Sequence, residues 1–305
     1  MSSTSDDRPI VGFKSEPSHF RVVEQLSFEL SGAGEHAYVQ VRKTGINTTD
    51  AAARLARFAG VAGRDVGYAG MKDKWAVADQ WFSLPAAELD FSGADLGAEM
   101  VVLGQGRHER KLRRGQVAAN AFDVTLVGAP ADLPLPARPF PNYFGPQRFG
   151  DCNLEQARSW IGRRRQRRVS RFKQGLYLST LRSHLFNCVL AERERLANWA
   201  TPVPGDVLDD AGRPTGPLWG RGRSPVSDVA AKIESAALRH EQSLLDALEH
   251  AGVDQSRRAL VAEARNLSVS PAPEGAKVSF SLDAGTYATV FLAQHVQLHD
   301  RSAEV

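Results

Sequence analysis

Residues 67–84 read GYAGMKDKWAVADQWFSL, and in this segment a single aspartate, Asp73, lies between two lysines. From Val77 onward apolar and polar residues alternate, which is typical of a half-buried β-strand. The glycines and the charged triplet KDK predict a turn before that strand, and RDVGYAG predicts a short strand ahead of the turn. Asp73 is therefore predicted at a turn between strands, where a rigid scaffold holds a side chain that remains reachable from the surface.

The sequence around this segment predicts more strands than helices. FRVVEQLSFEL, HAYVQVRKTG, VVLGQGRHERKLRRG and NAFDVTLVG read as further strands, most of them with apolar and polar residues in alternation. NTTDAAARLARFAGV instead has apolar residues at helical spacing, with Asn47, Thr48 or Thr49 as its N-cap and Gly60 at its end. We therefore predict an α+β fold in which helices pack on a mostly antiparallel sheet.

A proline-rich segment divides the chain. Residues 129–141, APADLPLPARPFP, contain five prolines in thirteen positions, a density that stops helices and central strands. The sequence beyond it is mainly helical in its periodicity, until KVSFSLDAG restores a strand pattern. We predict a discontinuous first domain formed by residues 1–138 and 262–305, with a helix-rich second domain, residues 139–261, inserted into it.

The composition is that of a globular, water-soluble chain. Of its 305 residues, 42% are hydrophobic and 24% are charged, and no run approaches the roughly 20 apolar residues of a membrane span. The N-terminal sequence MSSTSDDRPIVGF lacks the pattern of a secretory signal. Cys152 and Cys188 form no close pair, which argues against a disulfide framework or a zinc site. We expect a cytoplasmic protein without membrane attachment.

The net charge of +3 is distributed unevenly. Residues 163–173, RRRQRRVSRFK, hold seven basic side chains and no acid, and residues 107–114, RHERKLRR, hold five against one glutamate. A solvated helix face usually mixes both signs. The two clusters therefore favour an anionic partner, of which a phosphate backbone is the commonest, although charge alone leaves RNA, DNA, anionic lipid and a solvated surface open.

Sequence motifs for cofactors and metals are missing. The chain has no glycine-rich phosphate loop, no dinucleotide fingerprint, no His-Glu-x-x-His, no clustered Cys/His set and no Gly-x-Ser-x-Gly. We therefore expect any catalysis to use ordinary side chains, without a cofactor and without a metal.

Several segments, taken together and in order, resemble the TruD family of tRNA pseudouridine synthases. They are KSEPSHFRVVE (residues 14–24), GYAGMKDKWAVADQWFSL, RKLRRGQVAANAF (110–122), PNYFGPQRFG (141–150) and AGTYAT (284–289). The resemblance implies a pseudouridine synthase catalytic domain with an inserted TRUD domain. It also implies an isomerase that acts on tRNA, with uridine 13 of the D-arm as its target.

The resemblance assigns roles to residues of the site. Asp73 holds the position of the family's nucleophile, and a carboxylate, ionised at pH 7, needs no partner base. Lys14 is expected to orient that carboxylate, with an ordinary surface lysine as the alternative. Phe20, Phe122 and Tyr287 match positions that line the uracil pocket, and Asn120 offers an amide to the uracil edge. For Phe20 and Phe122, core packing is the alternative.

Basic side chains are expected to contact the phosphates of the RNA. Alternation along an extended chain would point Lys72 and Lys74 away from the side that Asp73 faces, so we interpret them as phosphate contacts. The basic clusters and the segment PNYFGPQRFG supply the other expected contacts, which are Arg110, Lys111, Arg113, Arg148, Arg164 and Arg167.

The resemblance is incomplete near the C-terminal end. Ala293 and Gln294 stand where the family usually has an Arg-Glu pair, and Asp79 stands where a threonine is usual. We expect a monomer with tRNA as its partner. Two alternatives stay open: an RNA-binding module or RNA chaperone without catalysis, and a synthase that modifies a different RNA site.

Overall fold

The structure is a computed structural model that describes residues 7–86, 88–150, 153–163 and 168–302. It divides into two compact units. Unit 1 comprises Met1–Ala137, Ala264–Gly285 and His295–Val305, and unit 2 comprises Arg138–Glu263 and Thr286–Gln294. Residues 286–294, which the sequence places in the first domain, thus group with unit 2.

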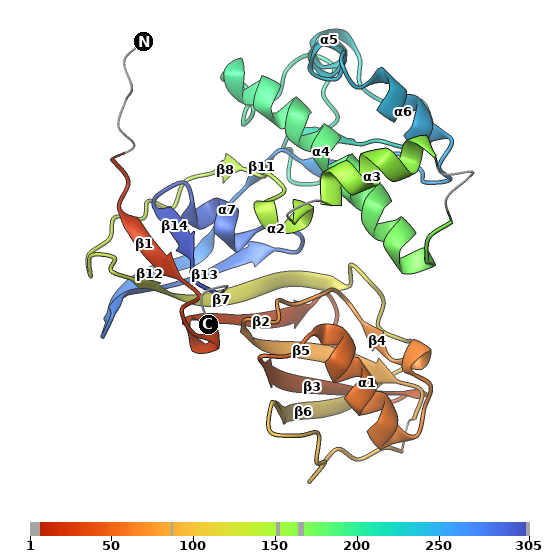
Figure 1. Cartoon of the computed structure of the whole chain (residues 1–305), viewed down its shortest axis with the longest axis vertical. Helices are drawn as coiled ribbons and strands as arrows, with labels where there is room; N and C mark the ends of the chain where they lie inside the picture. Colours follow the sequence, from red (N-terminus) through yellow and green to blue (C-terminus); the bar gives the residue numbers. More distant parts are fainter. Residues whose placement is uncertain (1–6, 87, 151–152, 164–167, 303–305) are drawn as a thin grey trace. The chain divides into compact units, whose positions relative to one another are not determined.

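Unit 1 is built on a ten-stranded sheet (Figure 1). Seven of the strands lie in the order β12–β13–β7–β2–β5–β3–β6. Their bounds are Arg265–Ala272 (β12), Gly275–Asp283 (β13), Val117–Val127 (β7), Phe20–Leu26 (β2), Val77–Leu84 (β5), His36–Thr44 (β3) and Met100–His108 (β6). The remaining strands are β1 (Ile10–Phe13), β4 (Gly67–Tyr68) and β14 (Gln297–Asp300).

Most neighbouring strands of the sheet run antiparallel. The exceptions among the described strands are the pair β2–β5, in which Val22 lies opposite Ala78, and the pair β1–β14, in which Ile10 lies opposite Gln297. β12, β13, β7 and β2 form a continuous antiparallel ribbon, as do β5, β3 and β6. The predicted α+β fold with a mostly antiparallel sheet is confirmed.

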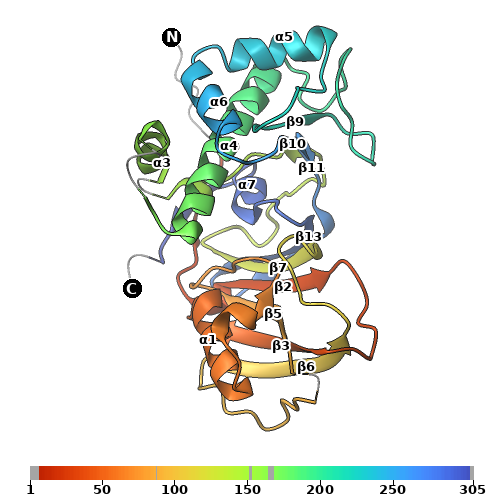
Figure 2. The same cartoon turned by 90° about the vertical axis from the view of Figure 1, so that its right-hand side faces the viewer.

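Helix α1 (Thr48–Ala59) packs on one face of β5, β3 and β6 (Figure 2). Its apolar residues, among them Leu55, meet Val41 and Phe82 of the strands in a fully buried cluster. Gly60 ends the helix with φ +66°, a left-handed conformation that glycine adopts without steric cost. Asn47 is at the N-cap position, but its side chain makes no capping hydrogen bond. The predicted helix is confirmed between the expected ends.

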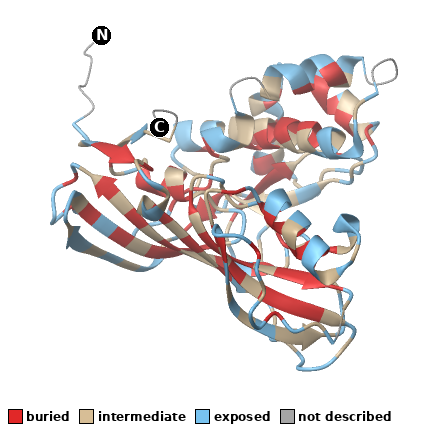
Figure 3. Cartoon of the chain, turned by 60° about the horizontal axis from the view of Figure 1, so that its bottom comes forward, coloured by how far each residue is buried: buried red, intermediate tan, exposed pale blue. Residues whose placement is uncertain are grey.

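The opposite face of the sheet carries charged residues. Asp79 of β5 is 3% exposed and accepts hydrogen bonds from Arg42 of β3 (2.7 and 2.8 Å) and from Arg21 of β2 (2.9 Å). Figure 3 shows that buried and more exposed residues alternate along the strands, because successive side chains point to opposite faces of the sheet. Two 3-10 turns, Pro17–His19 (η1) and Gly63–Asp65 (η2), complete unit 1.

Unit 2 is helix-rich, with the long helix α4 (Arg171–Arg195) in contact with α3 and α5. The other helices are α2 (Pro146–Phe149), α3 (Asn153–Gly162), α5 (Asp228–Ala237), α6 (Gln242–Glu249) and α7 (Ala288–Leu292). Two short antiparallel pairs join β8 (Phe140–Pro141) to β11 (Val261–Ala262) and β9 (Thr215–Leu218) to β10 (Ser256–Ala259). Residues 228–249 contain two helices, α5 and α6, with residues 238–241 between them.

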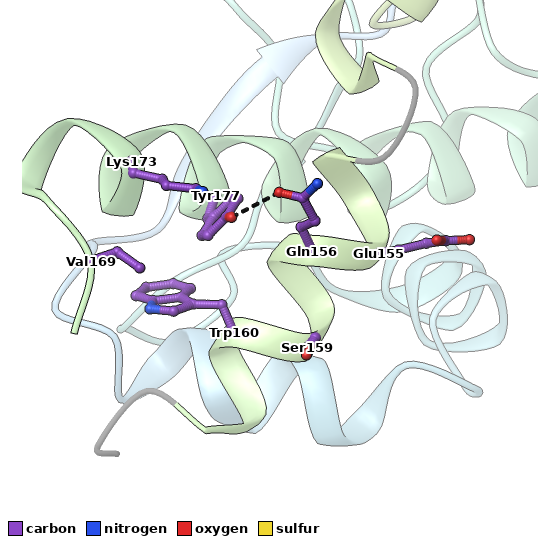
Figure 4. A pocket seen from close by; sticks show the side chains of 7 residues that line it. All are labelled: Glu155, Gln156, Ser159, Trp160, Val169, Lys173 and Tyr177. Carbon is purple, nitrogen blue, oxygen red and sulfur yellow. Dashed lines mark hydrogen bonds between the residues drawn. The ribbon is translucent and has the colours of Figure 1, made fainter. Parts of the chain in front are cut away.

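A pocket of about 350 Å³ lies where α3 meets the start of α4 (Figure 4). Trp160 and Tyr177 form its aromatic wall, with ring centroids 5.5 Å apart, and the Tyr177 hydroxyl donates to Gln156 Oε1 at 3.1 Å. Both aromatic side chains are only 4% exposed, so they belong chiefly to the core of unit 2.

Within the described part of the chain, no helix combines the length and the apolar character needed to cross a bilayer.

Candidate active site

Asp73 and Lys14 meet in unit 1. Asp73 lies between β4 and β5, and a third of its side chain is exposed (33%), whereas Lys14 follows β1 and is 2% exposed. The Lys14 ammonium contacts Asp73 Oδ2, and the backbone N–H of Trp75 donates to Oδ1 at 3.0 Å. Both carboxylate oxygens are thus held in place while the group stays reachable. Lys14 is not an ordinary surface lysine.

The surroundings of Lys14 fix its position. Its backbone has φ +56°, a left-handed conformation that is uncommon for residues other than glycine. The indole of Trp75 donates to the Lys14 carbonyl at 2.8 Å, and the ammonium lies 5.0 and 4.9 Å from the ring centroids of Phe13 and Phe20. A buried ammonium between two rings needs a counter-ion, and Asp73 supplies it.

Lys43 is a site residue that the sequence analysis did not identify. It is completely buried at the end of β3, and its ammonium donates to the backbone carbonyls of Asp73 (2.7 Å) and Ile46 (2.8 Å). Burial lowers the pKa of Lys43 to about 8, against the attraction of Asp73. The sequence does contain a signal for the burial of Lys43. Every second residue of β3 before it, Val39 and Val41, is buried, and Lys43 is the next residue on the same face.

Two of the predicted aromatic residues, Phe20 of β2 and Phe122 of β7, form a row with Phe280 of β13. Ring centroids of Phe20 and Phe122 are 5.8 Å apart, and those of Phe122 and Phe280 are 5.3 Å apart in a stacked arrangement. Phe20 and Phe122 are 7% and 8% exposed. Phe122 lies between two rings, which favours the core-packing interpretation for this residue, whereas Phe20 also borders Lys14.

Asn120 is joined to Lys72, and this corrects the interpretation of Lys72 as a phosphate contact. The Lys72 side chain is only 11% exposed, and its ammonium lies 2.6 Å from Asn120 Oδ1 and 2.9 Å from Glu24 Oε2. The alternation argument was wrong here because residues 71–74 form a loop and not an extended strand. Lys72 points into the site, where its charge is already compensated.

The other predicted RNA contacts of unit 1 differ in exposure. Lys74, Arg110 and Arg113 are exposed, as a phosphate contact requires. Lys111 is half-buried, and its ammonium donates to the backbone carbonyl of Arg64 at 2.7 Å. The predicted contacts Arg164 and Arg167 lie outside the described residues.

Tyr287 and Arg148 belong to unit 2. Tyr287 is at the N-cap position of α7, and its ring centroid is 6.0 Å from that of Phe144. Burial raises the pKa of Tyr287. Arg148 donates to Ser183 (3.2 Å) and contacts Ser179, both on α4. Tyr287 and Arg148 thus lie beside the same segment, since the Arg148 guanidinium is also 5.8 Å from the Phe144 ring.

One group of potential metal ligands exists among the described residues outside the site. His184, Cys188 and Glu241 bring their ligand atoms within 4.8 Å of one another. Arg158 already donates to both Glu241 oxygens, at 2.9 and 2.5 Å, and lies 2.8 Å from His184 Nε2. The guanidinium therefore provides the positive charge that a metal would bring, and the group is an ion-pair network.

The chain is similar to known proteins over most of its length. The family model of tRNA pseudouridine synthase D (TruD) matches residues 3–157. A tRNA pseudouridine synthase D of Methylococcus capsulatus is 40% identical over 92% of this chain and 89% of its own, and one of Nitrosococcus oceani is 38% identical over 93% and 90%. A crystal structure from Methanosarcina mazei, titled as tRNA pseudouridine synthase D (TruD), shares the fold at TM-score 0.63, with 18% identity over 97% of this chain and 96% of that one. The chain belongs to the TruD family of tRNA pseudouridine synthases, a family of isomerases.

Proposed function

We propose that this protein converts uridine 13 in the D-arm of tRNA to pseudouridine and that Asp73 is the nucleophile. The arrangement of Lys14, Asp73 and Trp75 supports the proposal most directly. It holds one carboxylate at both oxygens and leaves a third of the side chain exposed. Such a group is oriented for attack without a separate base.

The reaction balances without an oxidant or reductant. The N1–C1′ glycosidic bond breaks, the uracil turns, and a C5–C1′ bond forms, while the proton of C5 is lost and N1 gains one. The Asp73 carboxylate forms a covalent bond in the first half of the reaction and is released in the second half, so it is regenerated. Lys14 and the Trp75 amide keep the carboxylate directed at the reacting atoms throughout.

The target nucleotide must leave its stack to reach Asp73. Phe20 and Asn120 of unit 1 hold the extruded uracil in this proposal, and the exposed Lys74, Arg110 and Arg113 contact phosphates. Residues 1–138 and 262–305 act as the catalytic domain, and residues 139–261 act as the inserted TRUD domain. The protein works on tRNA as a monomer.

Tritium release from C5 tests the proposed reaction. Unmodified tRNA labelled at C5 of its uracils is incubated with wild type, Asp73→Ala and Asp73→Asn, and with Asp79→Asn as a matched control on the opposite face of the sheet. Wild type and the control should release one tritium per tRNA, at uridine 13 by mapping, whereas both Asp73 variants release none and still bind tRNA. Turnover by Asp73→Ala at the wild-type rate contradicts the proposed role.

A second candidate is an RNA-binding module without catalysis. Ala293 and Gln294, directly after α7, replace the family's usual Arg-Glu pair, and the Gln294 side chain donates to the backbone carbonyl of Val290 at 3.3 Å. This module would bind tRNA with wild-type affinity and release no tritium. Release at a different uridine would instead identify a synthase for another RNA site.

A further inference from the structure

Glu24, Lys72 and Asn120 form one connected group beside Asp73. The register of β2 and β7 places Glu24 directly opposite Asn120, so the two side chains share one face of the sheet. Lys72 enters from the loop before β5 and contacts both, at 2.9 Å to Glu24 Oε2 and 2.6 Å to Asn120 Oδ1. Because Lys72 precedes Asp73 in the chain, the group is adjacent to the nucleophile.

The contact with Lys72 determines the orientation of the Asn120 amide. An ammonium has three donors and no acceptor, so it approaches the oxygen of an amide and not its NH2 group. The Nδ2 of Asn120 donates to no partner among the described residues, and the side chain is half-buried. Asn120 therefore presents a hydrogen-bond donor to whatever enters the site.

Glu24 keeps Lys72 in this position. The Glu24 side chain has no exposed surface, and its second oxygen, Oε1, accepts from the backbone N–H of Trp81 at 3.3 Å. Moving the Lys72 ammonium away would leave the buried Glu24 carboxylate without a compensating charge, which is costly away from water. Lys72 thus has one fixed place from which to hold the amide.

We propose that Glu24 and Lys72 are positioning residues that direct the NH2 group of Asn120 to O4 of the target uracil. The inference rests on the proposed function. Uracil carries a carbonyl oxygen at C4, whereas cytosine carries an amino group there, so a fixed donor pairs with uracil and opposes the cytosine amino group. The pair thereby makes the site select uracil.

Asn120→Asp is the most direct test. The aspartate keeps the contact with Lys72 and replaces the NH2 donor by an oxygen that only accepts. We expect kcat/KM for tritium release to fall at least ~30-fold while the thermal midpoint does not decrease. A kcat/KM within about threefold of wild type overturns the proposal.

A double-mutant cycle tests whether Glu24 acts through Asn120. Glu24→Gln should lower kcat/KM roughly 10-fold in the wild-type background and have no further effect in the Asn120→Ala background. Asp79→Asn, which removes a buried carboxylate from the other face of the sheet, should leave kcat/KM unchanged in either background, assayed at a temperature at which the variant is folded. Equal losses for Glu24→Gln in both backgrounds overturn the positioning role, and circular dichroism confirms that each variant is folded.

Thiouridines identify the carbonyl oxygen. In tRNA with 4-thiouridine at the modified position, wild-type kcat/KM should fall roughly 10-fold because sulfur is a weak acceptor, whereas 2-thiouridine should change it less than threefold. The reverse order overturns the assignment of O4. A wild type that releases no tritium from uridine refutes the proposed function, whereas an active wild type without coupling between Glu24 and Asn120 refutes this inference alone.

Discussion

The ammonium of Lys43 donates a hydrogen bond of 2.7 Å to the backbone carbonyl of Asp73. The same ammonium donates to Ile46 at 2.8 Å, so it connects the loop that carries Asp73 to the segment between β3 and α1. Lys14 fixes the carboxylate, whereas Lys43 fixes the backbone from which that carboxylate projects. The loop at residues 71–74 is thereby held from two sides without belonging to a strand.

Loss of the Lys43 contact should reduce turnover more than binding. We expect Lys43→Met to lower kcat for tritium release at least ~10-fold with KM for tRNA changed less than about threefold, because small displacements of a reacting group are costly. Steady-state kinetics of wild type and variant measure this. A rise in KM at constant kcat would show that Lys43 serves binding instead.

The lowered pKa of Lys43 predicts how stability changes with pH. Because burial lowers its pKa to about 8 from 10.5, the unfolded chain binds more protons than the folded chain between these values. The free energy of unfolding should therefore rise between pH 8 and pH 10 by roughly 1–3 kcal/mol more in wild type than in Lys43→Met. Urea unfolding of both proteins at the two pH values tests this, and parallel pH profiles would contradict it.

Asp79 should contribute stability that is lost in acid. Burial opposes its ionisation, but hydrogen bonds from Arg42 and Arg21 outweigh burial and lower the pKa of Asp79. The contribution is therefore present above the ordinary aspartate pKa and disappears as the pH falls through the lower, folded-state value. At pH 7 Asp79→Asn should reduce the free energy of unfolding by about 1–3 kcal/mol. The difference in the free energy of unfolding between wild type and Asp79→Asn should shrink below pH 4. A difference that does not depend on pH would refute the lowered pKa of Asp79.

Phe122 should matter mainly for folding. Its ring stacks on Phe280 and lies close to Phe20, and the side chain is 8% exposed. We expect Phe122→Leu to lower the free energy of unfolding by about 1–2 kcal/mol and kcat/KM by less than about threefold. Chemical denaturation and tritium release measure the two quantities. A large loss of activity in a stable variant would assign Phe122 to the uracil pocket.

The exposed basic residues after β6 should control the salt dependence of tRNA binding. Each neutralised phosphate adds ~0.7–0.9 to the slope of log K against log salt. Replacement of both Arg110 and Arg113 by alanine should reduce that slope by roughly 1.5 and leave kcat unchanged. Arg221→Ala, which removes an exposed cation paired with Asp254 at 2.9 Å, is the control with an unchanged slope. An unaltered slope in the double variant would place the RNA elsewhere.

Local patterns explain which parts of the fold could be predicted. β5 and α1 follow from periodicities of two and 3.6 residues within single segments, and Gly60 marks the end of α1 because of its own backbone freedom. The order of the strands depends on pairings such as Glu24 with Asn120, which no local pattern encodes.

In the site, too, features that depend on neighbouring residues in the chain were predicted, whereas features that depend on residues far away in the chain were not. Asp73 and Lys14 were identified because their flanking motifs resemble a known family. The direction of Lys72 was predicted wrongly, because a rule for extended strands was applied to a loop whose course is set by distant partners. A lysine is usually a surface residue, and the burial of Lys43 is indicated only by its position on the same face of β3 as the buried Val39 and Val41.

The parallel pairing of β1 with β14 has a consequence during translation. Lys14 immediately follows β1, whose register with β14 joins residues 10–13 to residues 297–300. A ribosome-bound chain can therefore display Asp73 long before β1, which carries Lys14 at its end, has its parallel partner, although Gly12 of β1 can already pair with Val127 of β7. We expect the contact between Lys14 and Asp73 to become fixed only after residue 300 has emerged from the ribosome, so a nascent chain without β14 lacks a firmly held Lys14–Asp73 pair.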